Sequence, residues 1–165
     1  MRIGFDAKRA FLNQTGLGNY SRDTIRILSS FFQENKYFLY TTEKKNNDLT
    51  FLSNRKNIFI IKPQSIFNRT LKSYWRSKGI LKDIHSNKIN IYHGLSHEIP
   101  IGIEKTSIKT IVTIHDLIFI RYPHLFNPID RKIYFSKFKS SCERANKIIA
   151  VSQQTKKDII NFFNI

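Results

Sequence analysis

The pair His115-Asp116 is the feature of this sequence with the clearest chemical potential. It follows a run in which six of the seven residues from Ile108 to Ile114 are β-branched, as expected of a strand buried on both faces of a parallel sheet. In open α/β sheets, ligands bind beyond the carboxyl ends of the strands. An imidazole and a carboxylate at that place can exchange hydrogen bonds or protons with a ligand. The structural alternative is a loop-capping histidine beside a salt-bridged aspartate, and position alone favours neither.

A second candidate is the segment Gly16-Leu17-Gly18-Asn19-Tyr20-Ser21. It resembles the start of a dinucleotide fingerprint, but Ser21 replaces the third glycine and the loop before it is too long for the tight turn. Gly16 and Gly18 would still let a backbone approach a phosphate or sugar at a helix N-terminus. The alternative is a flexible loop that requires positive φ angles. We favour substrate contact through Gly16, Leu17, Gly18 and Tyr20, because the segment lies on the expected ligand edge.

His93 and His97 are four residues apart with Glu98 adjacent, a spacing that can bind zinc when a helix carries it. His93 is expected to end a strand that Gly94 breaks, so no helix displays the two rings together. We therefore predict no metal ion and no other cofactor. His93, Gly94 and Ser96 are instead candidates for substrate contact at the rim of the sheet.

Two further residues could act as nucleophiles. Cys142, the single cysteine, falls on the apolar face of an expected helix, which favours a place in the core. Ser152 lacks the Gly-x-Ser-x-Gly elbow that exposes a catalytic serine. It is expected to cap a helix at the ligand edge, where we count it among the substrate-binding candidates. A phosphate-binding Gly-x-x-x-x-Gly-Lys-Ser/Thr loop is absent from the sequence.

The rest of the chain predicts strands that alternate with helices. The expected strands are 3–6, 37–41, 58–61, 89–93, 110–114 and 147–151, with a polar loop and a short helix over 44–54. One helix is expected from an Asn19 cap, with the stripe Tyr20, Thr24, Ile27, Leu28 and Phe31. A long helix is expected from an Asn68 cap, with the stripe Leu71, Tyr74, Trp75, Leu81 and Ile84. Two more begin at Asn127-Pro128, with the stripe Ile133, Tyr134, Phe138, Ser141 and Cys142, and at Ser152, with Ile159, Ile160 and Phe163.

This pattern predicts a single α/β domain over residues 1–165, with a Rossmann-like, largely parallel sheet flanked by helices. Right-handed crossovers place the carboxyl ends of all strands on one edge. That edge collects Asp6, the Gly16–Gly18 segment, residues 93–98, the His115-Asp116 pair and Ser152. The convergence of polar and glycine-rich segments predicts a ligand cleft there.

The bulk composition limits the classes of partner. The formal net charge is +16, from 28 Lys and Arg against 12 Asp and Glu, which favours an anionic partner: nucleic acid, an acidic membrane face or a phosphorylated ligand. The alternative is an A/T-rich coding bias, because Lys, Asn, Ile, Phe and Tyr abound together. Scattered lysines argue against nucleic acid. The single cysteine and the immediate entry into a strand predict a cytoplasmic protein without a signal peptide.

Four passages, in this order, resemble the N-terminal domain of a retaining glycosyltransferase of the two-domain GT-B fold, in the large family 4 group. They are Thr15-Gly16-Leu17-Gly18-Asn19-Tyr20-Ser21; Tyr92-His93-Gly94-Leu95-Ser96 with Ile99-Pro100; Thr113-Ile114-His115-Asp116-Leu117 with Tyr122-Pro123; and Ala145-Asn146-Lys147-Ile148-Ile149-Ala150-Val151-Ser152. No single motif is specific, but four in register extend over essentially the whole chain.

The resemblance implies that this domain holds the acceptor and closes over a nucleotide-sugar donor, which a C-terminal domain binds. It implies that His115 lies beside the transferred sugar and bonds to a hydroxyl, and that Gly16 and Gly18 lie against the donor phosphate or the acceptor. It implies that Asp116 orients His115 or shapes the loop. It also implies transfer with retention and without a metal, the oxocarbenium-like charge being stabilised by the leaving diphosphate.

The chain ends at Ile165, about where the linker to the second domain begins in this family. We therefore expect the donor-binding domain to be absent and the chain to be inactive alone, as a fragment or a natural stand-alone domain. The expected acceptor is a saccharide or a lipid-linked saccharide at the inner membrane face, where anionic lipids would attract the basic surface. The alternative function is a stand-alone basic module that binds a phosphorylated ligand or nucleic acid without catalysis.

Overall fold

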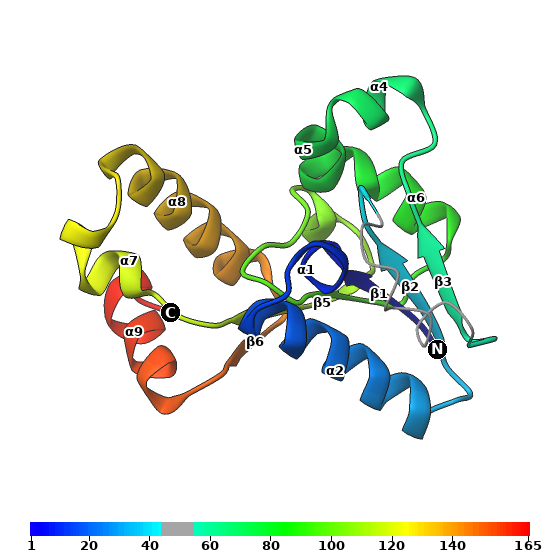
Figure 1. Cartoon of the computed structure of the whole chain (residues 1–165), viewed down its shortest axis with the longest axis horizontal. Coiled ribbons are helices and arrows are strands. Elements are labelled where there is room, and N and C mark those ends of the chain that lie inside the picture. Colours follow the sequence, from blue (N-terminus) through cyan, green and yellow to red (C-terminus); the bar gives the residue numbers. More distant parts are fainter. Residues whose placement is uncertain (44–54) are drawn as a thin grey trace.

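A computed structural model describes residues 1–43 and 55–165 (Figure 1). The loop and short helix predicted over 44–54 lie outside these residues. The described strands form one sheet in the order β3-β2-β1-β4-β5-β6, and every neighbouring pair is parallel. The strands are β1 (Arg2–Asp6), β2 (Lys36–Tyr40), β3 (Ile58–Ile61), β4 (Ile91–Gly94), β5 (Lys109–Ile114) and β6 (Lys147–Ala150). The predicted Rossmann-like α/β fold is confirmed, with a sheet that is wholly parallel over these strands.

The strand order reverses direction between β1 and β4, which lie side by side in the sheet. Such a switch point opens a crevice at the carboxyl ends, because the connections from the two strands leave toward opposite halves of the sheet. Asp6 is the last residue of β1, and Gly94 is the last residue of β4. The fold therefore places these two residues at the position where doubly wound sheets bind ligands.

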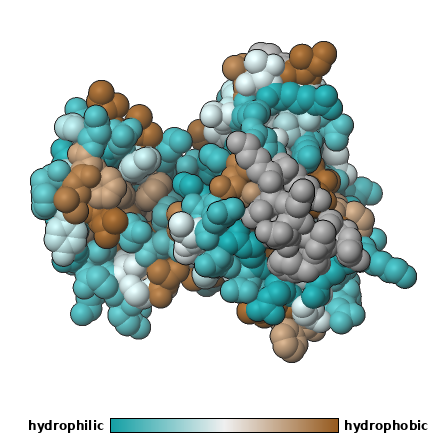
Figure 2. Space-filling view, in the orientation of Figure 1, coloured by the Kyte–Doolittle hydropathy of each residue, from teal (hydrophilic) through white to brown (hydrophobic). Residues whose placement is uncertain are grey.

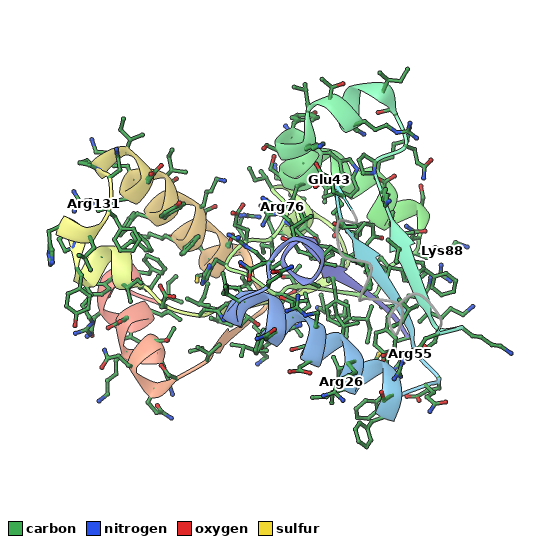
Figure 3. All side chains as sticks on the ribbon, in the orientation of Figure 1. Arg26, Glu43, Arg55, Arg76, Lys88 and Arg131 are labelled. Carbon is green, nitrogen blue, oxygen red and sulfur yellow. The ribbon has the colours of Figure 1, made fainter. Side chains whose placement is uncertain are left out.

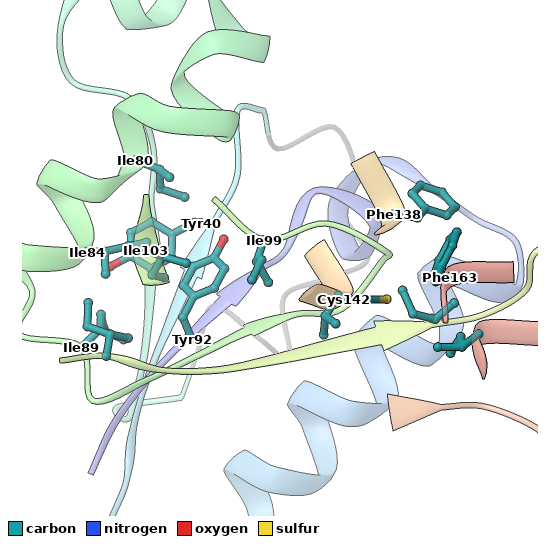
Figure 4. Packing of buried hydrophobic residues seen from close by; sticks show 14 of the residues in the cluster. Tyr40, Ile80, Ile84, Ile89, Tyr92, Ile99, Ile103, Phe138, Cys142 and Phe163 are labelled. Carbon is teal, nitrogen blue, oxygen red and sulfur yellow. The ribbon is translucent and has the colours of Figure 1, made fainter. Parts of the chain in front are cut away.

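Each face of the sheet carries its own apolar cluster. In β2, Tyr37 and Leu39 point into one cluster while Phe38 and Tyr40 point into the other, as the two-residue period of a strand requires. Helices α1 (Lys8–Leu12) and α2 (Gly16–Phe31) contribute to the first cluster. Helices α6 (Ile80–Ser86), α8 (Pro128–Arg144) and α9 (Gln153–Phe163) contribute to the second, seen from close by in Figure 4.

The predicted starts of α8 and α9 are confirmed. The Asn127 side chain accepts a hydrogen bond from the N–H of Ile129, and Ser152 Oγ accepts one from the N–H of Thr155. The predicted stripe of α8 is only partly right: Phe138, Ser141 and Cys142 are buried, whereas Ile133 and Tyr134 are exposed. In α9, the predicted Ile160 is also exposed, while Ile159 and Phe163 are buried.

The predictions for α1 and α2 need correction. The polar segment after Asp6 contains helix α1, and α2 begins at Gly16 with Thr15 as its N-cap, so Asn19 is inside the helix. Small side chains form the buried face of α2: Ser21 and Ser29 flank Ile25, whereas Ile27 and Phe31 of the predicted stripe are exposed. The predicted stripe is therefore only partly right, since its Tyr20 and Leu28 do pack against the first cluster.

The long helix predicted from Asn68 is broken into several pieces. These are α4 (Ile66–Thr70), α5 (Lys72–Tyr74), the π-helical turn η2 (Trp75–Gly79) and α6. Asn68 lies inside α4 and does not cap it. Its N–H donates a hydrogen bond to Ser65 Oγ. Leu71 and Tyr74 are exposed, whereas Trp75 is buried. Gly79 closes the π turn, and a π turn is a common signature of a functional site.

The remaining short helices are η3 (Ile103–Lys105), α7 (Ile118–Arg121) and η4 (Pro123–Leu125). The Arg121 guanidinium pairs with the buried Asp158 carboxylate and so ties α7 to α9. Over residues 1–43 and 55–165, no helix combines the length and the apolar character that crossing a membrane requires.

Candidate functional site

Two adjoining cavities lie at the carboxyl edge of the sheet, where the surface in Figure 2 is hollowed between the α8 lobe and the α4–α5 lobe. The first, here called the aromatic cavity, has a volume of about 240 Å³. Its lining is Arg9, Leu17, Arg76, Ser96, His97, Glu98, Asp116, Ile118, Phe119, Phe126, Tyr134 and Phe138. The second, the basic cavity, has a volume of about 250 Å³ and shares Arg9, Arg76, Glu98 and Tyr134 with the first. A ligand can therefore extend from one cavity into the other.

His115 follows β5 and is half-buried at this edge. Its Nε2 lies 2.9 Å from the carbonyl oxygen of Leu95, and a carbonyl only accepts, so Nε2 carries the proton. In the neutral form of the ring, Nδ1 then holds a lone pair, and no group among the described residues bonds to it. The Tyr20 ring packs edge-on against the imidazole at 4.8 Å between centroids. His115 is thus fixed by its neighbours while one ring nitrogen stays available to a ligand.

His97 is a residue whose positional importance the sequence did not reveal. Its φ is +66°, a left-handed conformation that costs a non-glycine residue roughly 1–2 kcal/mol and persists only where surrounding contacts hold it. Its ring stacks on Phe138 at 4.2 Å, and its Nε2 accepts the backbone N–H of His115 at 3.0 Å. His97 therefore sets the backbone from which the His115 ring projects.

Two buried histidines at this edge are neutral. Burial, together with the nearby His115, Arg9 and Arg76, lowers the pKa of His97 from 6.5 to about 3. Burial lowers the pKa of His93 to about 4, and its Nε2 is 2.8 Å from the Thr113 hydroxyl. His93 thus faces the protein interior rather than either cavity. The lone pair on His97 Nε2 is already used, and the described residues contain no group of three or more His, Cys, Asp or Glu side chains that could hold a metal ion.

Asp116 lines the aromatic cavity but does not orient His115. Its Oδ1 accepts the N–H of Ile118 at 3.3 Å, so the carboxylate shapes the start of α7. Of the two roles that the sequence resemblance implied for Asp116, the geometry gives it the loop-shaping one. The backbone of His115 is held from another side, where Thr155 Oγ1 donates to its carbonyl oxygen at 2.9 Å.

The glycine-rich segment is the first turn of α2 rather than a flexible loop. Neither Gly16 nor Gly18 has a positive φ, so the alternative interpretation, a loop that requires positive φ angles, is wrong. Gly18 is buried against α1, and a Cβ there would lie 1.8 Å from the Asn13 carbonyl oxygen. Gly16 is exposed, and a Cβ there would meet nothing within 4 Å. Leu17 enters the aromatic cavity.

The other predicted contacts are distributed unevenly. Ser96 lines the aromatic cavity. Gly94 is buried, and a Cβ there would lie 2.1 Å from the Glu98 carbonyl oxygen, so this glycine lets the following loop fold back on the strand. Ser152 lines a separate, mostly apolar cavity of about 660 Å³ between β6 and α9, which contains none of the other predicted site residues. The structure therefore gathers Leu17, Ser96 and Asp116 at one cavity and leaves Ser152 apart.

The strongest interaction at this edge links residues that the sequence did not connect. Arg76, carried by the π turn, donates from Nε and Nη2 to Asp6 Oδ2 at 2.9 and 2.8 Å. Its Nη1 lies 3.5 Å from Glu98 Oε1. Burial disfavours the charged guanidinium, but the two carboxylates outweigh burial and raise the pKa of Arg76 above its ordinary value. Figure 3 labels Arg76 close to α1, at the switch point of the sheet.

Cys142 is buried, which confirms it as a core residue. Burial raises the pKa of its thiol to about 12 and leaves no thiolate at neutral pH.

Comparison with known sequences gives one family. Residues 24–165 match the sequence model of Glycosyltransferase Family 4, a span that includes His115 and Asp116 but starts after the first turn of α2. A search of curated proteins gives no match to this chain.

Proposed function

This chain belongs to glycosyltransferase family 4, and on that basis we propose that it is the acceptor-side domain of an enzyme that transfers a sugar from a nucleotide-sugar donor to a saccharide or lipid-linked acceptor. The observation that carries the proposal is the convergence of Leu17, Ser96 and Asp116 on one cavity, at the same edge of the sheet as the fixed His115 ring, which itself lines neither of the two cavities. A cavity with several aromatic walls and a few polar groups suits a sugar, whose C–H faces pack on rings.

In the proposed reaction, the bond between the anomeric carbon and the donor phosphate oxygen breaks and a bond to the acceptor oxygen forms. The acceptor proton leaves with the diphosphate. Nδ1 of His115 accepts a hydrogen bond from a hydroxyl of the transferred sugar, and so positions that sugar without exchanging a proton. The first turn of α2 at Gly16 offers backbone N–H groups to the diphosphate. Retention of configuration and independence of metal are part of this proposal and follow from the family.

A donor screen on the gene product that carries this chain tests the proposal. We expect one nucleotide sugar to release its nucleoside diphosphate in the presence of a saccharide acceptor, with no loss in EDTA. His115→Gln keeps a donor for the Leu95 carbonyl but moves the acceptor atom, and we expect a loss of about 100-fold in kcat/KM, within the range of positioning effects. His85→Gln, at an exposed position on α6, is the matched control.

Equal activity of the two variants would contradict the role of His115, and failure of every sugar nucleotide would contradict the transferase proposal. The 165-residue chain alone is expected to turn over no donor, since the proposal assigns donor binding to a second domain. Turnover by the isolated chain would contradict that assignment. A basic module without catalysis would instead bind a phosphorylated ligand or nucleic acid with steep salt dependence and no sugar preference.

We also propose that α7 and α8 bring the enzyme to an anionic membrane. Leu125 of η4, the turn between these two helices, and Ile129 of α8 are 67% and 68% exposed, and apolar side chains gather on this lobe in Figure 2. Exposed Lys132 and half-buried Arg131 neighbour them in the chain. Apolar side chains beside cations favour the interface of an anionic bilayer. The lobe is continuous with the aromatic cavity, because Ile118 of α7 lines it, so a lipid-linked acceptor can reach the cavity from the bilayer.

Vesicle sedimentation tests this proposal. We expect binding to vesicles that contain phosphatidylglycerol, with a loss of at least about 30-fold in the variant Leu125→Ser/Ile129→Ser, which removes roughly 2–4 kcal/mol of apolar transfer energy. The control variant Ile27→Ser/Phe31→Ser removes comparable exposed side chains from α2. The same loss in both variants would mean that α7 and α8 are not the membrane-binding surface.

A further inference from the structure

The basic cavity is lined by many more cationic than anionic side chains. Its charged lining consists of Lys8, Arg9, Lys72, Arg76 and Lys137 with the single carboxylate Glu98. These residues come from α1, α5, the π turn and α8, and the β4–β5 connection supplies Glu98. The hydroxyls of Thr42, Ser73 and Ser77 line the same space. Cations with hydroxyl donors around a cavity of about 250 Å³ form a lining that suits an anion.

Three of the five cations are paired. Arg76 is bound by Asp6 and Glu98, Lys137 lies 3.6 Å from the second oxygen of Glu98, and Lys72 pairs with Glu43. Within residues 1–43 and 55–165, no carboxylate forms an ion pair with Lys8 or Arg9, although both are half-buried. The cavity thus carries an excess of positive charge that its own carboxylates do not neutralise.

In the absence of a ligand, the positive charges of the basic cavity repel one another. Burial, followed by the charges of Arg76 and Arg9, lowers the pKa of Lys8 from 10.5. A bound anion would offset this repulsion and favour the charged form of Lys8. Arg9 forms no ion pair with a carboxylate among the described residues, and it lines both cavities. Arg9 therefore lies at the junction between the basic and aromatic cavities, whereas Lys8 lines the basic cavity alone.

We infer that the acceptor of this enzyme is itself anionic: its phosphate monoester or diester occupies the basic cavity between Lys8, Arg9 and Arg76, and its sugar or polyol lies in the aromatic cavity. This inference rests on the proposed transferase function for the word acceptor. Arg76 is held rigidly by Asp6, so it presents a fixed donor, while Lys8 and Arg9 supply the uncompensated charge. Tyr134 lines both cavities and marks where the two parts of the ligand join.

Binding to the 165-residue chain, measured by ¹⁵N NMR at about 150 mM NaCl to screen weak surface attraction, tests the inference without turnover. The probes are glucose 6-phosphate, glucose, UDP and dihexanoyl-phosphatidylglycerol below its micelle concentration. We expect both phosphate esters to shift amides of α1 and the π turn, and glucose to leave them unchanged. Tighter binding of the lipid identifies a headgroup as the source of the phosphate, and tighter binding of glucose 6-phosphate identifies a soluble acceptor.

The decisive comparison is between two double variants with the same change in net charge. Lys8→Gln/Arg9→Gln removes the unpaired cations, and we expect at least about tenfold weaker binding of glucose 6-phosphate, from the loss of charge-assisted bonds. Lys36→Gln/Lys82→Gln removes two exposed cations elsewhere and should change affinity less than about twofold. Equal losses would overturn the inference, since the field of the whole protein would then explain binding.

Two other results would also overturn it. One is the absence of phosphate-dependent shifts in α1, and the other is displacement of glucose 6-phosphate by UDP, which would make the cavity a donor subsite. An enzyme that transfers sugar but shows no phosphate binding at α1 would refute this inference while leaving the proposed function intact. Phosphate binding at α1 without any sugar transfer would refute the proposed function while leaving the anion site in the basic cavity intact.

Discussion

Alanine substitutions at the two glycines of α2 separate a structural role from a ligand-binding role. At Gly18, a Cβ would lie 1.8 Å from the Asn13 carbonyl oxygen and 2.7 Å from its carbon, both backbone atoms that cannot rotate away. At Gly16, a Cβ would meet nothing within 4 Å. Neither residue has a positive φ, so backbone conformation does not explain either glycine. Gly18 is required by packing, whereas the fold gives Gly16 no reason to be glycine.

The magnitudes follow from these contacts. Gly18→Ala must push α1 and α2 apart, an overpacking that costs about 1–3 kcal/mol. It also strains the hydrogen bond from the Gly18 N–H to Asn13 Oδ1, worth about 1 kcal/mol. The better helix propensity of alanine offsets about 0.5–1 kcal/mol. We expect a net destabilisation of about 2–3 kcal/mol for Gly18→Ala, and a stabilisation of about 0.5 kcal/mol for Gly16→Ala.

Urea unfolding, followed by the fluorescence of the single buried tryptophan, Trp75, measures both effects. Donor binding by the gene product that carries the chain measures the second role. If the donor phosphate lies against Gly16, Gly16→Ala should keep or raise stability and yet weaken donor binding by about tenfold, since a methyl group then fills space that belongs to the ligand. A Gly18→Ala protein as stable as the wild type would refute the steric reasoning. Unchanged donor binding in Gly16→Ala would refute the ligand role.

Three further predictions follow from buried groups. Arg76→Gln leaves the Asp6 carboxylate buried without its partner and should destabilise the protein by about 3–5 kcal/mol in urea unfolding, with partial recovery when Asp6→Asn is added. His93 and His97 stay neutral when folded, with pKa values of about 4 and about 3, but take up protons near pH 6.5 when unfolded. The contribution of these two histidines to the free energy of unfolding is therefore complete above about pH 6.5. It falls as the pH drops toward 4 and then 3, by up to about 1.4 kcal/mol per pH unit for each histidine. His97→Gln should reduce that slope by about half. Cys142, with a pKa of about 12 and a buried thiol, should react with a disulfide reagent at pH 8 only as fast as the protein opens, and rapid labelling of the folded protein would contradict its burial.

The strands could be predicted because local residue type decides them. The β-branched run from Ile108 to Ile114 becomes β5, and the short apolar runs elsewhere become the other strands within a residue or two. The starts of α8 and α9 were also predictable, since a capping side chain, followed in α8 by a proline, acts within one turn of the helix. In each case, the signal and the structure lie within a few residues of one another.

The helices fail where packing, rather than hydropathy, chooses the face. Ser21 and Ser29 lie on the buried side of α2 beside Ile25, whereas Phe31 of the predicted stripe is 77% exposed. The segment from Asn68 looked like one amphipathic helix, but it breaks at Leu71 and contains a π turn, so that Leu71 and Tyr74 are exposed while Trp75 is buried as predicted. No local periodicity predicts a change of phase that only the tertiary contacts stabilise.

The same distinction between local signals and tertiary contacts explains why the electrostatic character of the site could not be predicted. Strand topology alone brings Asp6, Glu98 and Asp116 to the carboxyl edge, and the sequence predicted a polar, glycine-rich rim there without assigning its cations. The folded rim is basic, because Arg76 reaches Asp6 across 70 positions of the chain and helix α1 adds Lys8 and Arg9. Lysines and arginines on helices are ordinarily solvated, and only the tertiary structure distinguishes those that line a cavity. The sequence could therefore locate the cleft, whereas the charge of its ligand depends on contacts between distant segments.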